Sequence, residues 1–83
     1  MENTIELIAK KLETVKFETI DKAAEIQALN LANEILYPLK ESNEIQDYTF
    51  SASIVGDILN ISIFITEGGC AESVQWDLTI TKK

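Results

Sequence analysis

Two segments of alternating apolar and polar residues flank the pair Gly56-Asp57, and this arrangement constrains the fold more than any other feature of the chain. The first segment, residues 48–55, reads YTFSASIV, and the second, residues 58–66, reads ILNISIFIT. A repeat of two residues is typical of a β-strand that buries one face. Glycine at the first central position of a two-residue loop favours a type II′ turn. The sequence therefore predicts a β-hairpin.

The turn also predicts the register of this hairpin. If Val55 pairs with Ile58, each apolar residue of the first strand lies opposite an apolar residue of the second. These pairs are Ile54 with Leu59, Ala52 with Ile61, Phe50 with Ile63 and Tyr48 with Ile65. A shift of one residue would move a whole apolar set to the other face, so the agreement between turn and pattern supports this register.

A third alternating segment, residues 73–81, reads SVQWDLTIT and predicts another strand. The connection formed by residues 67–72 is short enough to make this strand an antiparallel neighbour of the second. The apolar positions of the third strand are Val74, Trp76, Leu78 and Ile80. The predicted sheet has one apolar face and one face dominated by serine and threonine.

Two amphipathic segments before the hairpin predict helices. In residues 4–15, apolar side chains recur at steps of three and four residues, which places them on one side of a helix of about three turns. In residues 18–42, two neighbouring rows of apolar residues recur at the same steps. A stripe of that width predicts that the second helix is well buried.

The ends of these helices are predicted from residues with known preferences. Asn3 or Thr4 is expected to cap the first helix, and Thr19 the second. Pro38 has no N–H for a helical hydrogen bond, and it disfavours helical backbone at the residue before it. The second helix should therefore either kink at this proline and close with a short turn or stop near Leu36.

These elements predict an α+β fold with the order ααβββ. A chain of 83 residues forms one domain with a small core, so residues 1–83 are expected to be a single unit. Only the helices can cover the apolar face, which gives two N-terminal helices packed on one face of a three-stranded antiparallel meander. The outer strands of a meander have free edges, which either accept a strand of another protein or are tolerated in a monomer.

The charge balance excludes some partners. Seven lysines, no arginine and 14 acidic residues give a net charge of −7. Without a basic stripe the chain is not expected to bind nucleic acid, and an anionic membrane surface would repel it. The acidity either mimics nucleic acid toward a basic partner or serves solubility alone.

The composition also argues against an enzyme. The chain has no histidine, which removes the commonest general base and histidine-based metal sites. Its single cysteine, Cys70, lies in the segment TEGGCAES, where Glu67 and Glu72 would oppose thiolate formation if they lie close. Residues 68–69 are glycines suited to a connection between strands. We expect no catalytic residue, no cofactor and no metal site, and we interpret Cys70 as a connecting residue rather than a functional thiol.

No apolar run reaches the roughly 20 residues that a membrane span requires, and residues 1–11 lack the features of a signal peptide. A lone cysteine cannot form an internal disulfide, which fits a reducing compartment. The predicted location is the cytoplasm.

Four residues are candidates for binding another protein. Phe64 points from the middle of the second strand to the polar face, and Val55 lies on that face near the hairpin end. An isolated exposed aromatic is common in soluble proteins, but on a contact face Phe64 would be the natural anchor. Asp77 and Thr79 belong to the polar side of the third strand, which is an edge strand. Binding would use this edge or the Ser/Thr face.

The runs ILYPLKESNEIQDYTF, GDILNISIFI and AESVQWDLTIT, within residues 35–81, resemble the carboxy-terminal domain of contractile phage tail sheath proteins. The shared features include the steps Asp47-Tyr48 and Ala71-Glu72. The turn at Gly56-Asp57 replaces a longer insert found in the sheath family. The large amino-terminal part and the extended arms of the sheath proteins have no counterpart in this sequence. The resemblance implies a small phage-type assembly protein with partner contacts at the sheet edges.

Two hypotheses about function follow. In the first, the chain is a small acidic non-enzymatic protein, phage-derived and structural, which binds another protein or itself. In the second, it is an acidic phage-type inhibitor of a host defence nuclease, comparable to an anti-CRISPR protein that mimics nucleic acid. Salt separates them, because binding led by charge weakens steeply as salt rises. Both place the protein in a bacterial host cytoplasm.

Overall fold

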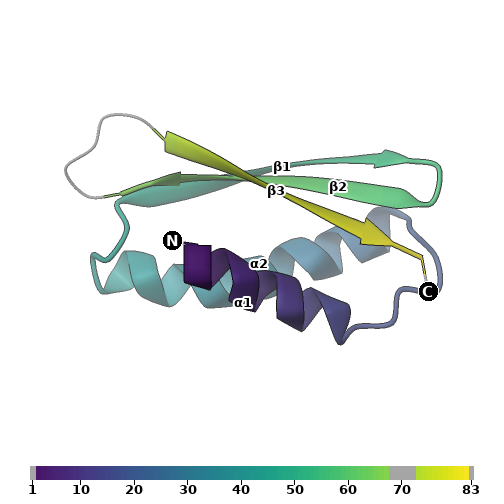
Figure 1. Ribbon diagram of the computed structural model, residues 1–83, viewed down its shortest axis with the longest axis horizontal. Coiled ribbons are helices and arrows are strands. Elements are labelled where there is room, and N and C mark those ends of the chain that lie inside the picture. The colour runs from purple at the N-terminus through teal and green to yellow at the C-terminus, as the bar shows by residue number, and fades with distance from the viewer. Residues whose placement is uncertain (1, 68–72, 83) are drawn as a thin grey trace.

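The fold is a two-layer α+β arrangement in which two helices cover one face of a three-stranded sheet (Figure 1). The computed structural model describes residues 2–67 and 73–82. The elements follow the chain in the order α1 (Glu2–Glu13), α2 (Lys22–Glu41), β1 (Asp47–Val55), β2 (Ile58–Thr66) and β3 (Ser73–Thr81). The sheet is an antiparallel meander with the order β1-β2-β3. The predicted fold class and element order are confirmed.

Helix α1 buries a narrow apolar stripe formed by Ile5, Ile8 and Leu12. The helix begins at Glu2, so the prediction that Asn3 or Thr4 caps it is wrong, because both residues lie within its first turn. The acidic residue in the first turn and lysines in the last turn complement the helix dipole. No helix among the described residues combines the length and apolar character needed to cross a membrane.

Helix α2 begins after Asp21, not at Thr19 as the sequence predicted. The Asp21 backbone is extended and its Oδ1 accepts a hydrogen bond from the Ala24 N–H at 3.0 Å, the usual N-cap geometry. Phe17 and Ile20 in the preceding connection are also buried. Small side chains on the covered side of α2 let it lie close to the sheet; its buried residues are Ala24, Ala28, Ala32 and Leu36.

Pro38 lies inside α2, which continues to Glu41 rather than stopping near Leu36. The helix ends in a Schellman motif: Asn43 takes a positive φ of 64°, and the Glu44 N–H donates to the Leu39 carbonyl at 2.9 Å. The chain then enters the core at Ile45, which is almost fully buried. The C-terminal end of α2 is therefore determined by the residues that follow Pro38.

The hairpin has the register predicted from the sequence, with Val55 opposite Ile58 and the four apolar pairs as expected. Gly56 has a φ of +61°, and Asp57 is not among the residues with positive φ, as a type II′ turn requires. The third strand is also confirmed, and it pairs with β2 along its whole length.

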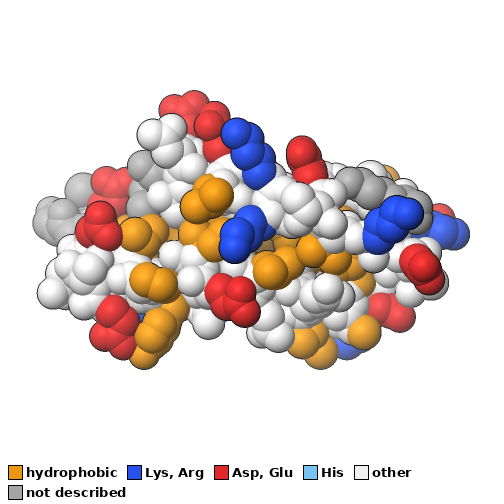
Figure 2. All heavy atoms as spheres, turned by 90° about the horizontal axis from the view of Figure 1, so that it is seen from below, with side chains coloured by type: hydrophobic (Ala, Val, Ile, Leu, Met, Phe, Trp, Pro, Cys, Tyr) orange, Lys and Arg blue, Asp and Glu red, His pale blue; other side chains and the backbone are white. Residues whose placement is uncertain are grey.

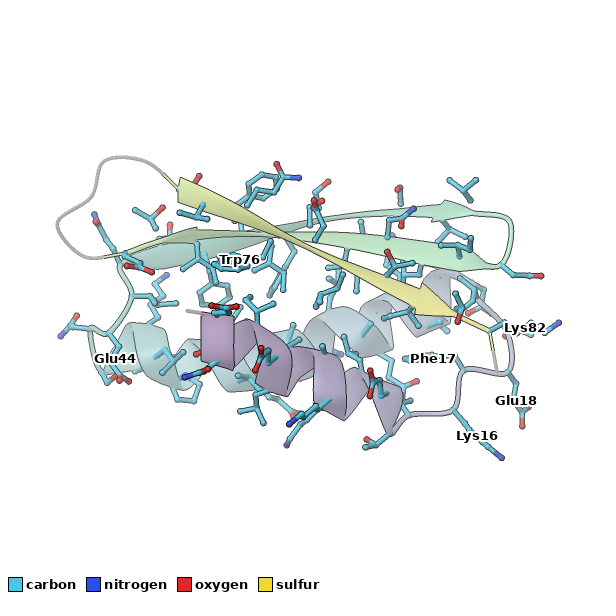
Figure 3. All side chains as sticks on the ribbon, viewed as in Figure 1. Lys16, Phe17, Glu18, Glu44, Trp76 and Lys82 are labelled. Atoms are coloured by element: carbon cyan, nitrogen blue, oxygen red, sulfur yellow. The ribbon has the colours of Figure 1, made fainter. Side chains whose placement is uncertain are left out.

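The core lies between the layers. Its centre is β2, whose helix-facing side chains are almost completely buried; these are Leu59, Ile61, Ile63 and Ile65. Helix α2 lies under β1 and α1 under β3. Trp76 projects from β3 toward the helical layer (Figure 3), and its indole N–H is buried without a hydrogen-bond partner among the described residues. Such a group costs about 1–3 kcal/mol, which the surrounding packing has to outweigh.

Candidate protein-binding face

The face of the sheet that carries no helix is formed by alternate residues of all three strands, and we call it the open face. Its members are Asp47, Thr49, Ser51, Ser53, Val55, Ile58, Asn60, Ser62, Phe64, Thr66, Ser73, Gln75, Asp77, Thr79 and Thr81. The helices lie wholly on the opposite side of the sheet (Figure 1). The helices therefore leave the open face uncovered.

Phe64 lies at the middle of the open face in sheet order, because it belongs to the central strand. Its neighbours across the sheet are Thr49 on β1 and Gln75 on β3, and its neighbours along β2 are Ser62 and Thr66. These side chains are shorter or more polar than the phenyl ring, yet they leave the ring only partly exposed. The predicted orientation of Phe64 is confirmed.

Charge is almost excluded from the sheet. The three nine-residue strands contain two charged residues, Asp47 and Asp77, whereas 21 of the 83 residues of the chain are charged. Asp47 lies at the first position of β1, where its Oδ1 is 3.2 Å from the Lys40 Nζ of α2. Asp77 is then the single carboxylate within the body of the open face. Solvated surfaces usually carry many charges of both signs, so this surface is unusual.

Asp77 is held by its neighbours rather than left to solvent alone. The Ser62 hydroxyl donates a hydrogen bond to Asp77 Oδ1 at 2.8 Å, and the Gln75 amide Nε2 donates to the same oxygen at 2.9 Å. The hydrogen bond from Gln75, followed by that from Ser62, keeps the pKa of Asp77 below its ordinary value. Thr79 Oγ1 lies 3.4 Å from Asn60 Oδ1, to which it donates. The two predicted β3 residues thus belong to a polar network between β2 and β3.

Val55 lies apart from this network, at the hairpin end of the open face. It is 66% exposed and pairs directly with Ile58, which is 41% exposed. Ile58 was missed as a member of the face, although its pairing with Val55 already implied it. Together they form an exposed apolar patch on the open face beside the turn. The structure therefore places the four predicted residues on one face, with Phe64 centrally, Val55 at one end, and Asp77 and Thr79 along β3.

The free edges of the sheet differ in the space beside them. A hollow of about 460 Å³ lies between β3 and the C-terminal part of α1. Its lining comprises Ala9, Leu12, Glu13, Val15, Phe17, Leu78, Thr79, Ile80 and Thr81. Beside β1, Tyr48 instead donates a hydrogen bond to Asn33 of α2 and packs edge-to-face on Phe50, with the ring centroids 5.6 Å apart.

The helical layer presents a different surface. Seen from below in Figure 2, acidic side chains are interspersed with lysines and with hydrophobic side chains. Exposed hydrophobic residues on this layer include Leu7 and Ile26, each about half exposed. A second hollow, of about 430 Å³, lies beside Ile26 and Leu31.

Within residues 2–67 and 73–82, no three acidic or cysteine side chains are grouped so that they could hold a metal ion. The expectation that Cys70 is not a functional thiol concerns a residue outside the described part of the chain. The expectation that the chain is not an enzyme stays a prediction.

Comparisons with protein-family models, with curated proteins and with solved structures found no match. The resemblance of residues 35–81 to the phage tail sheath domain therefore stays a prediction.

Proposed function

We propose that this chain is a non-enzymatic protein-binding domain whose open face docks on another protein with Phe64 as the anchor. The observation that carries the proposal is the central, partly exposed phenyl ring on a sheet face that is nearly free of charge. The cores of protein interfaces are depleted in charged residues and enriched in aromatic ones. The low charge and the central ring of this face both match that composition.

The composition of the face indicates the chemistry of the partner. Serine, threonine, asparagine and glutamine side chains supply both donors and acceptors, and Phe64 requires an apolar pocket on the other surface. The partner is expected to present an uncharged, hydrogen-bonding surface around such a pocket. A ring of polar contacts that excludes water around one aromatic anchor is the usual arrangement of a binding hot spot.

The test is differential capture from the cells that make the protein. Immobilised wild-type protein, Phe64→Ser and the matched control Ile26→Ser, which changes an exposed residue of α2, are compared by mass spectrometry of the recovered proteins. A partner retained by wild type and Ile26→Ser and weakened at least about tenfold by Phe64→Ser supports the proposal. A partner lost only with Ile26→Ser contradicts it. Circular dichroism checks that each variant is folded.

Salt then separates this proposal from the acidic inhibitor. Docking through a face with few charges should weaken little between low and physiological salt, whereas occupation of a basic nucleic-acid channel should weaken steeply. The identity of the captured partner separates the finer alternatives: virion components favour a phage assembly role, and a nuclease complex favours inhibition.

A further inference from the structure

The two outer strands offer different sites for an added strand. Beside β1, the Lys40 ammonium of α2 lies 3.2 Å from Asp47 and 6.0 Å from the centroid of the Tyr48 ring, so α2 side chains cross the start of this strand. Beside β3, the hollow next to α1 leaves room for side chains of an incoming strand. Strand addition needs a free edge together with a place for alternate side chains. The β3 edge has both.

The hairpin determines which backbone groups point out of the sheet. Residues that close a two-residue turn exchange both backbone hydrogen bonds, and every second pair along the ladder does the same. Val55 and Ile58 close the turn. The hydrogen bond from the Gln46 N–H to the Thr66 carbonyl, 2.8 Å long, agrees with this alternation, because Thr66 lies an even number of residues from Ile58.

It follows that β2 directs the backbone of its odd-numbered residues toward β3. Their partners on β3 are the even-numbered residues. The backbone N–H and C=O groups of Gln75, Asp77 and Thr79 therefore point away from the sheet. These are the groups that an added strand would pair with.

The β3 edge also carries an apolar side chain that the described residues leave half exposed. Val74 lies on the helix-facing side of the strand, yet 51% of it is exposed. If β3 pairs antiparallel with β3 of a second copy about a two-fold axis at Trp76, Val74 of one copy lies opposite Leu78 of the other. Leu78 lines the hollow beside α1. The symmetry makes this contact twice, as in any interface between identical patches.

The same register suits the polar side chains. It sets Gln75 opposite Asp77 and Ser73 opposite Thr79, pairs that can hydrogen-bond across strands. A register centred on Asp77 would set two carboxylates against each other, which is destabilising. Among these arrangements, only the one centred on Trp76 brings Val74 to the hollow and keeps the carboxylates apart.

We propose that the β3 edge is a self-association surface at which two copies join residues 73–79 antiparallel, centred on Trp76, into a six-stranded sheet. The two-fold axis is perpendicular to the sheet, so both open faces lie on the same side of the dimer. The dimer then presents two Phe64 anchors to a partner, which would raise its avidity for a repeated target. Because each copy has a net charge of −7, salt should strengthen this association by screening the repulsion.

The experiment is sedimentation velocity over a range of protein concentrations, in low and in physiological salt, with the emission of the single tryptophan as a second readout. We expect a reversible dimer of the 9.3 kDa chain, of roughly micromolar or weaker affinity, and a shift of the Trp76 emission that follows the dimer fraction. Phe64→Ser should dimerise like wild type, which separates this proposal from the proposed function. A chain that stays monomeric at every concentration overturns it.

A proline substitution at the β3 edge tests the geometry. Thr79→Pro removes an outward N–H, which edge strands tolerate, and should leave a folded monomer. If Thr79→Pro dimerises as wild type does, the edge is not the interface.

A matched charge pair tests the register. Gln75→Lys places an ammonium opposite Asp77 of the other copy and should tighten the dimer, whereas Gln75→Glu should weaken it, each by roughly threefold to tenfold. This pair is informative even if Thr79→Pro fails to fold. If both variants change the dimer affinity equally in the same direction, or if neither changes it, the register is wrong.

Discussion

The two faces of the central strand β2 differ in what covers them, although the same strand supplies both. On one face, Ile61, Ile63 and Ile65 are almost completely buried under the helices. On the other face, Ser62, Phe64 and Thr66 remain partly exposed. The covered face accounts for the fold, so the residues of the open face are not required by folding. The proposed function assigns the aromatic residue at the centre of that face, Phe64, to contact with another molecule.

The largest expected effect comes from a pair of substitutions at neighbouring positions of β2. Ile63→Ala removes a fully buried side chain and should lower the free energy of unfolding by about 2–5 kcal/mol. Phe64→Ser should lower it by about 1 kcal/mol, the span of strand preferences. Urea denaturation measures both. Equal losses would remove the distinction between the two faces.

The next prediction concerns the hairpin turn, which determines which residues lie on each face. Gly56 has a φ of +61°, and an added Cβ would meet no atom within 4 Å, so the cost of Gly56→Ala comes from the backbone alone. We expect a loss of about 1–2 kcal/mol in the free energy of unfolding. Asp57→Ala is the matched control and should cost much less. A neutral Gly56→Ala would mean that the turn does not hold the register.

The helix that covers the closed face gives a smaller effect. Asp21→Ala removes the N-cap of α2 and should cost about 1 kcal/mol in thermal or urea unfolding. Thr19→Ala should be close to neutral, because the Thr19 hydroxyl is 3.5 Å from Asp21 Oδ2 and caps nothing itself. Since Asp21 lies in the helical layer, its replacement should not change capture of a partner by the folded protein. If Thr19→Ala lowers the free energy of unfolding more than Asp21→Ala does, Thr19 is the N-cap, as the sequence predicted.

The smallest effect concerns pH and the polar network of the open face. Hydrogen bonds from Gln75 and Ser62 lower the pKa of Asp77 in the folded chain. A carboxyl group with a depressed folded pKa stabilises the fold above its unfolded pKa, and this contribution is lost as the pH falls through the folded value. Asp77→Asn should therefore reduce the loss of stability below about pH 4, measured by denaturation at pH 7 and pH 3.

Some acid sensitivity should remain in that variant, because the pKa of Asp47 is also lowered, first by the Tyr48 N–H and then by Lys40. Unchanged acid sensitivity in Asp77→Asn would mean that the network contributes nothing to stability.

The parts of the fold that depend on short-range patterns were predictable from the sequence. The hairpin register followed from agreement between the Gly56 turn and the alternation of residues, and the open-face position of Phe64 followed from that register. The cap of α2 was not predictable in the same way, because Thr19 and Asp21 are both good caps. The hydrogen bond from the Ala24 N–H to Asp21 Oδ1 identifies the cap, and a local residue preference does not distinguish the two positions.

Two further features did not follow from the apolar patterns of the sequence. The continuation of α2 past Pro38 is ended by the Schellman motif at Asn43, where a local rule for proline predicted an earlier stop or a kink. The difference between the sheet edges arises from the hydrogen bond of Tyr48 to Asn33 and from the position of α1 beside β3. A period of two shows which residues share a face, but not which helix lies beside which edge.

The most direct test of the open face is site-specific photocrosslinking in the cells that make the protein. A benzophenone-bearing phenylalanine analogue is introduced in place of Phe64 and, as the control, in place of Tyr37, which is half exposed on α2. After irradiation, we expect a discrete adduct with another protein from position 64 and none from position 37. Absence of an adduct at position 64, or the same adduct from both positions, would contradict the assignment of the open face as the contact surface.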